Sequence, residues 1–448
     1  MCPVGNATDG INNFTHLEGA TSVAIFTIDV RTFAIVASPG DDGVQIMDVS
    51  DPSSPVPAGS ATDGVGGFTM LKRAQSVATF TIDDSTFAIV GSGADNGIQL
   101  MNVSDPYSPV ALGTAQDDVG NFSTLAGASG VATFKISAKT YAIVASFYED
   151  GVQLVDVSDP SMPVALGAAI ADGPGGFNTL NRATDAAIFI IGDSTFAIVT
   201  SPGDNGVQII EVSDPQNPVA VGFAVDGQNG FDMLGRASGV ATFTIGTLTY
   251  AIVASVAADG VQIIDVTDPS RPVAVSSATD GEHGFTKLAG ARGVSIVVLG
   301  PVTYAVVTGS FDNGVQLIDV SDPFKPVAVG SATHGEGGYD PLSGASGVAT
   351  FGIDGTMYVI VASRDDSGVM LIHVVGGEGK GSTKFGTPSG PTQDEFDDLK
   401  DGQNELKDKV EILKEQLAAI LAALNGPSRF TPLPKPLANP NDRAMLQL

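Results

Sequence analysis

Hydrophobic and polar positions repeat along this chain with a period of about 54 residues, and the repeat occurs seven times. Its clearest marker is an Asp-Gly or Asn-Gly turn, an apolar stretch that contains one Gln, and a Ser-Asp-Pro triplet. The marker occupies residues 42–52, 96–106, 150–160, 205–215, 259–269 and 313–323, with a degenerate seventh copy at 367–370. Periods of this length with strand-like content are typical of propellers, solenoids and other repeat arrays.

Within one repeat the pattern predicts four strands. The first, for example residues 77–82, and the second, for example 86–90, are rich in β-branched and aromatic residues. The third, such as 152–157, alternates apolar and polar positions. The fourth, such as 218–222, opens with Pro, which only an outer strand tolerates. Four antiparallel strands per repeat, without helical periodicity, indicate one propeller blade.

The two ends of the repeat region indicate how the array closes. Residues 3–10 copy a fourth strand and its following loop, whereas the seventh repeat ends after its third strand at Val375. The N-terminal strand therefore fits as the missing outer strand of the last blade, which would close a ring. We predict an all-β fold, a seven-bladed β-propeller over residues 1–375. An open solenoid is the alternative, but it needs capping ends, which the pattern does not provide.

The repeat resembles a known family. The run at residues 250–254, Tyr-Ala-Ile-Val-Ala, and the run at 260–269, Gly-Val-Gln-Ile-Ile-Asp-Val-Thr-Asp-Pro, are similar to the LVIVD repeat of bacterial and algal extracellular β-propellers. The resemblance covers about residues 3–375. It implies a secreted or cell-surface protein with a binding or structural role, and it implies no set of catalytic residues.

The charge balance excludes some partners. The chain has 50 acidic and 21 basic residues, a net charge of −29. Nucleic-acid binders and proteins that bind anionic membranes need basic patches instead. No apolar stretch is long enough to span a bilayer, no signal peptide is visible, and Cys2 is the only cysteine, so an internal disulfide is impossible.

Two loops of each repeat carry acidic residues and should share one face of a propeller. Oxygen-rich loops with Gly suit Ca²⁺, so Ca²⁺ is the candidate cofactor, although no copy matches the EF-hand pattern. The alternative is structural, because Asp before Gly forms turns and the following Phe and Leu could fill gaps between blades. The candidate ligands are Asp9, Asp63, Asp117, Asp172, Asp226 and Asp280 in the loops before the first six blades, and Asp42, Asp95, Asp150, Asp204, Asp259 and Asp312 between the second and third strands.

Catalytic signals are weak. His16, His283 and His334 lie in loops before neighbouring blades, which makes a three-histidine metal site one hypothesis. No Ser or Cys has the setting of a nucleophile, and no Gly-rich loop has the setting of a phosphate site. An active site needs unlike residues from several blades, and the copies read alike. The pattern therefore predicts no enzyme, and it favours a scaffold or a multivalent binding surface.

The composition changes after residue 375. Residues 376–392 read as a flexible linker, residues 393–425 as a coiled-coil helix and residues 426–448 as a Pro-rich tail. An apolar heptad seam in water needs a partner, so we expect a homo-oligomer, while a helix folded back on the propeller is the alternative and the number of helices stays open. The predicted seam consists of Phe396, Leu399, Leu406, Val410, Leu413, Leu417, Ile420 and Leu424.

These expectations combine into one functional hypothesis. We expect a non-enzymatic extracellular or cell-surface structural or adhesion protein that displays propellers on an oligomerising helix and binds an unidentified protein or glycan. One alternative is a metal-dependent hydrolase or lactonase with a site at the central channel. Another is an intracellular scaffold that binds peptides.

Overall fold

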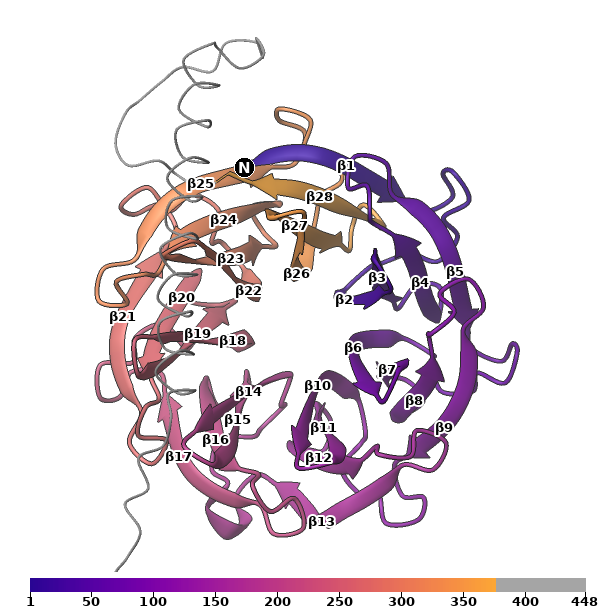
Figure 1. Ribbon diagram of the computed structural model, residues 1–448. Helices are drawn as coiled ribbons and strands as arrows, with labels where there is room; N and C mark the ends of the chain where they lie inside the picture. Colours follow the sequence, from indigo (N-terminus) through magenta and orange to yellow (C-terminus); the bar gives the residue numbers. More distant parts are fainter. Residues whose placement is uncertain (376–448) are drawn as a thin grey trace, which may run out of the picture. The chain divides into compact units, whose positions relative to one another are not determined.

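The computed structural model describes residues 1–375, which form seven four-stranded antiparallel sheets arranged around a central axis (Figure 1). In six of the sheets, four consecutive strands run in sequence order from the innermost to the outermost position. The predicted seven-bladed β-propeller is therefore confirmed. The predicted linker, coiled-coil helix and tail lie outside the described residues.

The first six blades each consist of four consecutive strands. Blade 1 contains β2 (Ser22–Ile28), β3 (Arg31–Ser38), β4 (Gly43–Asp48) and β5 (Val56–Thr62). Blade 2 contains β6 (Ala74–Ile82), β7 (Ser85–Ser92), β8 (Gly97–Asn102) and β9 (Val110–Gln116). Blade 3 contains β10 (Ala128–Ile136), β11 (Lys139–Ser146), β12 (Gly151–Asp156) and β13 (Val164–Ala171).

Blade 4 follows a short 3-10 turn, η1 (Pro174–Gly176), and contains β14 (Asp185–Ile191), β15 (Ser194–Ser201), β16 (Gly206–Glu211) and β17 (Val219–Val225). Blade 5 contains β18 (Ala237–Ile245), β19 (Leu248–Ser255), β20 (Gly260–Asp265) and β21 (Val273–Thr279). Blade 6 contains β22 (Ala291–Leu299), β23 (Val302–Gly309), β24 (Gly314–Asp319) and β25 (Val327–Thr333). Within residues 1–375, no helix has the length and hydropathy of a membrane span.

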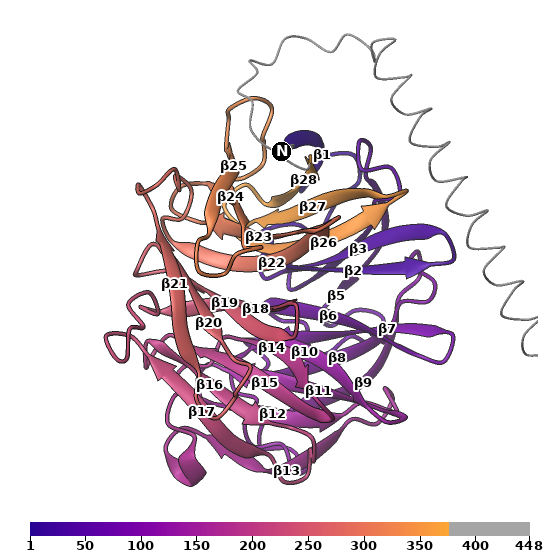
Figure 2. The ribbon, with the colours of Figure 1, turned by 60° about the vertical axis from the view of Figure 1, so that its left-hand side comes forward.

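Blade 7 joins the two ends of this region. It contains β26 (Ala345–Ile353), β27 (Thr356–Ser363) and β28 (Gly368–Val374), and its outer strand is β1 (Cys2–Thr8). The antiparallel register pairs Cys2 with His373 and Thr8 with Gly368. Figures 1 and 2 both show β1 alongside β28. The ring is thus closed by the N-terminal strand, as the sequence predicts.

The strand boundaries differ from the prediction at two places. The inner strand of blade 2 begins at Ala74 rather than at residue 77, because a bulge between Ala74 and Ser76 lets pairing with β7 continue. The outer strands of blades 1 to 6 begin one residue after the Pro, for example at Val219. Proline has no N–H to donate to the ladder, so pairing starts at the next residue.

A buried glutamine stabilises a bulge in the outer half of six blades. The register between β4 and β5 shifts between Gln45 and Met47. The Gln45 amide donates from Nε2 to the carbonyl of Gly59 (2.9 Å), and its Oε1 accepts the N–H of Thr15 (3.2 Å). The first bond satisfies a carbonyl that the bulge leaves out of the ladder, and the second ties the loop before blade 1 to β4. The same contacts recur at Gln99, Gln153, Gln208, Gln262 and Gln316.

The aromatic and leucine residues of the long loops fill the spaces between blades. Phe68 and Leu71 belong to one buried cluster with Ile46 of blade 1 and Ala88 of blade 2. The equivalent Leu is fully buried before every blade. The sequence-based prediction that these residues fill gaps between blades is confirmed, and it means that neighbouring sheets share one hydrophobic core.

Candidate functional site

Two kinds of loop meet on one face of the ring. We call the segment between an outer strand and the next inner strand the interblade loop, and the segment between the second and third strands of a blade the 2–3 loop. In blade 2 the interblade loop is residues 63–73 and the 2–3 loop is residues 93–96. The N–H of Lys72 donates to Asp95 Oδ2 (2.9 Å), so the two loops touch directly. The prediction that the two acidic loop sets share a face is confirmed.

The aspartates in these loops accept hydrogen bonds from three consecutive backbone N–H groups. Before blade 2 the donors are residues 71–73, and the acceptors are Asp63 (3.2 Å), Asp95 (2.9 Å) and Asp42 (2.8 Å). Asp63 belongs to the loop itself, Asp95 to the 2–3 loop of blade 2 and Asp42 to the 2–3 loop of blade 1. Carboxylate oxygens are strong acceptors for N–H groups. The three side chains therefore clamp the junction between adjacent blades.

The clamp recurs around the ring. In the first position the donor is always the buried Leu, at 2.9–3.2 Å from Asp9, Asp63, Asp117, Asp172, Asp226 and Asp280. In the second position the acceptors, at 2.6–3.1 Å, are Asp41, Asp95, Glu149, Asp204, Asp312 and Asp366. In the third position they lie at 2.7–2.9 Å and are Asp42, Asn96, Asp150, Asn205, Asp259 and Asn313.

The structure thus separates the predicted 2–3 loop ligands into two sets. Asp95, Asp204 and Asp312 hold the loop that enters their own blade. Asp42, Asp150 and Asp259 hold the loop of the following blade. The sequence did not distinguish the two sets, because the two positions are adjacent and Asp occurs at both.

Carboxylates of the first and second clamp positions lie close together. Burial raises the pKa of Glu149 and that of Asp312. The neighbouring carboxylates, Asp117 in one case and Asp280 in the other, raise these pKa values further, and the backbone N–H bond opposes the shift. Burial also raises the pKa of Asp41. Paired carboxylates of this kind can share a proton or a cation, and their oxygen chemistry fits Ca²⁺ among the metals.

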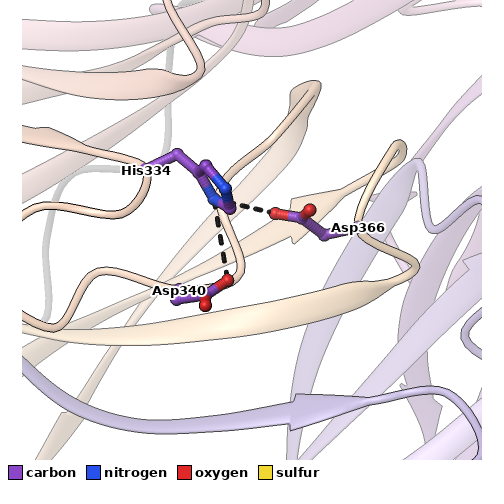
Figure 3. A group of neighbouring side chains, drawn as sticks. All are labelled: His334, Asp340 and Asp366. Carbon is purple, nitrogen blue, oxygen red and sulfur yellow. Dashed lines mark ion pairs between the residues drawn. The ribbon is translucent and has the colours of Figure 1, made fainter.

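Blade 7 departs from this arrangement (Figure 3). His334 takes the place of the first aspartate, and its Nδ1 lies 3.3 Å from the N–H of Leu342. The same nitrogen lies 3.0 Å from Asp366 Oδ2 and 3.6 Å from Asp340 Oδ1. Ligand atoms of these three residues lie within 4.8 Å of one another. One imidazole with two carboxylates could hold a divalent transition metal.

The His334 group was not predicted as such. In residues 1–375 it is the only cluster of three or more potential metal-ligating side chains within that distance, so the three-histidine hypothesis is not supported. His16 instead contacts the Thr62 hydroxyl through Nε2 (2.5 Å). One signal was present in the sequence: His334 stands eight residues before Leu342, where the other six copies have Asp.

A central channel of about 520 Å³ opens along the inner strands. Its wall is formed mainly by three consecutive residues near the start of each inner strand, for example residues 75–77 of β6. Most of these residues are Ser, Thr, Gly or Val. The first of the three carries a hydroxyl in most blades, and some of these hydroxyls tie blades together. For example, Thr21 Oγ1 donates to the carbonyl of Gln75 at 3.0 Å. The channel wall is therefore polar and closely joined from blade to blade.

Two charged residues of the inner strands break the seven-fold pattern of this wall. Asp185 on β14 stands where the other blades have Ser or Gly, and Arg292 on β22 stands where they have Ser, Thr or Gln. Arg73 and Arg364 also line the cavity. Our expectation that the copies are alike was wrong at these positions. Aligning the first residues of the inner strands would have revealed the difference, but these positions carry no chemical motif.

Comparison with known families agrees with the repeat. The family profile described as the LVIVD repeat matches residues 32–63, 137–168, 249–280 and 294–333. These segments lie in blades 1, 3, 5 and 6. No curated protein sequence matches the chain.

Solved structures show the same fold. A functionally unknown protein from Desulfotomaculum acetoxidans is 14% identical with a TM-score of 0.50, over 77% of this chain and 95% of that one. A Bacteroides fragilis protein provisionally described as a 6-phosphogluconolactonase is 12% identical with a TM-score of 0.52, over 78% and 92% of the two chains. At these identities the likeness shows the fold alone. The repeat matches and the closed ring show that this chain carries LVIVD repeats in four blades of a seven-bladed β-propeller.

Proposed function

We propose that this protein is a non-enzymatic structural or adhesion protein of the cell surface or extracellular space. The observation that supports it best is the use of the acidic side chains. On the face where the loops meet, carboxylates accept backbone N–H bonds in a recurring pattern before blades 1 to 6. Side chains engaged in this way stabilise a scaffold, whereas an active site needs unlike groups in one place. The LVIVD-repeat matches support the proposed extracellular location.

Self-association through residues 393–425 is part of this proposal. Several linked propellers would sum weak contacts with a protein or glycan partner into avidity. We expect the full chain to sediment as an oligomer and a variant lacking residues 393–425 to sediment as a folded monomer. Deleting the tail, residues 426–448, is the matched control and should leave the oligomer intact. An unchanged sedimentation coefficient per chain in the first variant would refute the assembly role.

We further propose Ca²⁺ as the ligand of the paired carboxylates. Each clamp carboxylate has two oxygens, and Ca²⁺ takes six to eight such ligands. Calorimetric titration of the full chain should show binding, with less bound Ca²⁺ in Asp312→Ala, because Ala258 is the natural residue at this position in blade 5. Mg²⁺ serves as the comparison ion. If millimolar Ca²⁺ produces neither heat nor a higher melting temperature, Ca²⁺ is not a ligand.

The second candidate function is a hydrolase or lactonase at the channel. Asp185 and Arg292 favour it, because they give the channel wall unlike charged groups. The protein from B. fragilis, described provisionally as a 6-phosphogluconolactonase, suggests a substrate to assay. Hydrolysis of that lactone above its spontaneous rate, lost in Arg292→Ser and measured with and without a chelator, would support the enzyme. A rate equal to the spontaneous one would exclude this substrate.

A further inference from the structure

The chain as a whole is negatively charged, whereas the charged residues that line the channel are mostly positive. The chain carries a net charge of −29, yet the charged residues that line the cavity are Arg73, Arg292 and Arg364 against Asp185 alone. Arg236, at the end of the interblade loop before blade 5, adds a positive charge near Arg292. A narrow cavity with protein walls focuses the field of such charges. The channel is therefore locally attractive to anions.

Arg292 is not needed to join the blades. At the equivalent position of blade 1, the Thr21 hydroxyl donates to the next blade. In blade 6 this bond is made by Thr308 on β23 instead, whose Oγ1 donates to the carbonyl of Ser346 at 2.7 Å. Thr200 of blade 4 makes the same kind of bond to the carbonyl of Ser238 in blade 5 (2.6 Å), beside that from Thr184 (3.3 Å). The structural contact to blade 7 is thus complete without the arginine.

The guanidinium of Arg292 has no anionic partner among the residues that the structure describes. Its side chain is partly buried, and neither an ion pair nor a hydrogen bond from its guanidinium is present there. Burial lowers the pKa of Arg292, and the charges of Arg364 and Arg236 lower it further, while the charge of Asp365, which forms no ion pair with Arg292, opposes the shift. Holding like charges together in a partly desolvated site is unfavourable unless an anion joins them. Arg364 is partly engaged, with Nε 3.1 Å from Asp365 Oδ1.

We propose that the channel binds a small anion bearing carboxylate or phosphate groups, with Arg292 as the principal contact and Arg73 and Arg364 as supporting charges. Arginine presents a planar pair of donors that matches the oxygens of both groups. A volume of about 520 Å³ is sufficient for a small organic anion and lies within the range of ligand pockets. This inference does not require hydrolysis, since binding is measured with ions that have no bond to cleave.

The test is calorimetric titration of the full chain with sodium phosphate and, separately, sodium malonate, at constant ionic strength with sodium chloride as the reference. We expect one of the two anions to bind, and its dissociation constant to rise at least tenfold in Arg292→Ser. Ser is the residue at this position in blades 3, 5 and 7, namely Ser129, Ser238 and Ser346. Preference for phosphate or malonate identifies the ligand class.

Arg271→Ser is the matched control. It removes the same charge from the loop between β20 and β21, at the other end of the strands, and Ser occupies this position in blades 1 and 2. It should leave the dissociation constant within about twofold of that of the parent. Arg292→Lys keeps the charge without the planar donor pair, so intermediate affinity is expected. No binding to the parent, or equal weakening in Arg271→Ser, would overturn the proposal. Melting curves in chloride check that each variant folds.

Discussion

Deleting residues 1–8, which include β1, is expected to open the ring and lower the free energy of unfolding by roughly 5 kcal/mol. The register pairs six residues of β1 with β28, and each hydrogen bond contributes about 1 kcal/mol net. The deletion also removes the buried Ala7 and the bond from the Tyr339 hydroxyl to the carbonyl of Met1 (2.7 Å). The exposed edge of β28 becomes a template for pairing with other chains. Thermal unfolding and light scattering measure both effects.

A single substitution tests the same closure without a deletion. A Cβ at Gly5 would clash with the carbonyl oxygen of Pro52 in blade 1, whereas a Cβ at Gly330, the equivalent position of β25, meets no described atom within 4 Å. Gly5→Ala should therefore lower the melting temperature, and Gly330→Ala should change it little. If the deletion leaves unfolding unchanged, β1 does not hold the ring together.

Replacing Asp185 with Ser is expected to stabilise the protein at neutral pH and to have little effect in acid. Burial raises the pKa of Asp185 to about 6, although its carboxylate accepts the N–H groups of Val240 (3.1 Å) and Ala186 (2.9 Å). Ser keeps an acceptor, because Ser22 receives the N–H of Val77 at the equivalent place in blade 1 (3.3 Å). The substitution therefore removes the charge while it preserves the contact between blades.

The sign of the pH dependence follows from the raised pKa. The folded-state pKa of Asp185 lies above its ordinary value of 3.8. The favourable contribution of the protonated carboxyl group to stability is therefore complete below about pH 4 and is lost as the pH rises through 6. One pKa unit corresponds to about 1.4 kcal/mol. Since the channel admits water, we expect the advantage of the variant to grow by about 1–2 kcal/mol between pH 4.5 and 7.5. Urea unfolding at both pH values measures it.

Asp84→Ser serves as the control for this pH effect. It removes the same charge from the exposed turn between β6 and β7. Its difference from the parent in free energy of unfolding should stay nearly constant over the same pH range. If Asp185→Ser also shows a constant difference, the Asp185 carboxylate is not destabilised in the folded protein.

The acidic loops have a physical explanation that composition alone did not provide. A repeated Asp-Gly pattern is compatible with metal ligands and with turns. The clamp around residues 71–73 shows how acidic side chains can gather at a blade junction, because each of Asp63, Asp95 and Asp42 receives a backbone N–H. This arrangement places an ordered array of carboxylates on one face. Removing any one of these carboxylates would therefore alter the contacts between loops as well as the charge.

The sequence by itself determined the fold. Seven copies of a repeat of about 54 residues predict seven blades, because each copy has the hydrophobic pattern of four strands. The extra fourth strand at residues 3–10 predicts how the ring closes. The same patterns predicted that Phe68 and Leu71 fill gaps between blades. Such features repeat with the period, so a single chain displays them seven times over.

The tertiary structure alone decided which side chains meet. His334 joins Asp340 and Asp366, and Asp42 reaches residue 73 of the next blade, because the ring brings together loops that are remote in sequence. Asp185 and Arg292 are unremarkable among the strand residues of the sequence. They acquire a role only because the inner strands converge on one channel. Each of these residues occurs in one copy of the repeat alone. What it can bind depends on side chains from other blades, and the repeat pattern does not show which of them lie nearby.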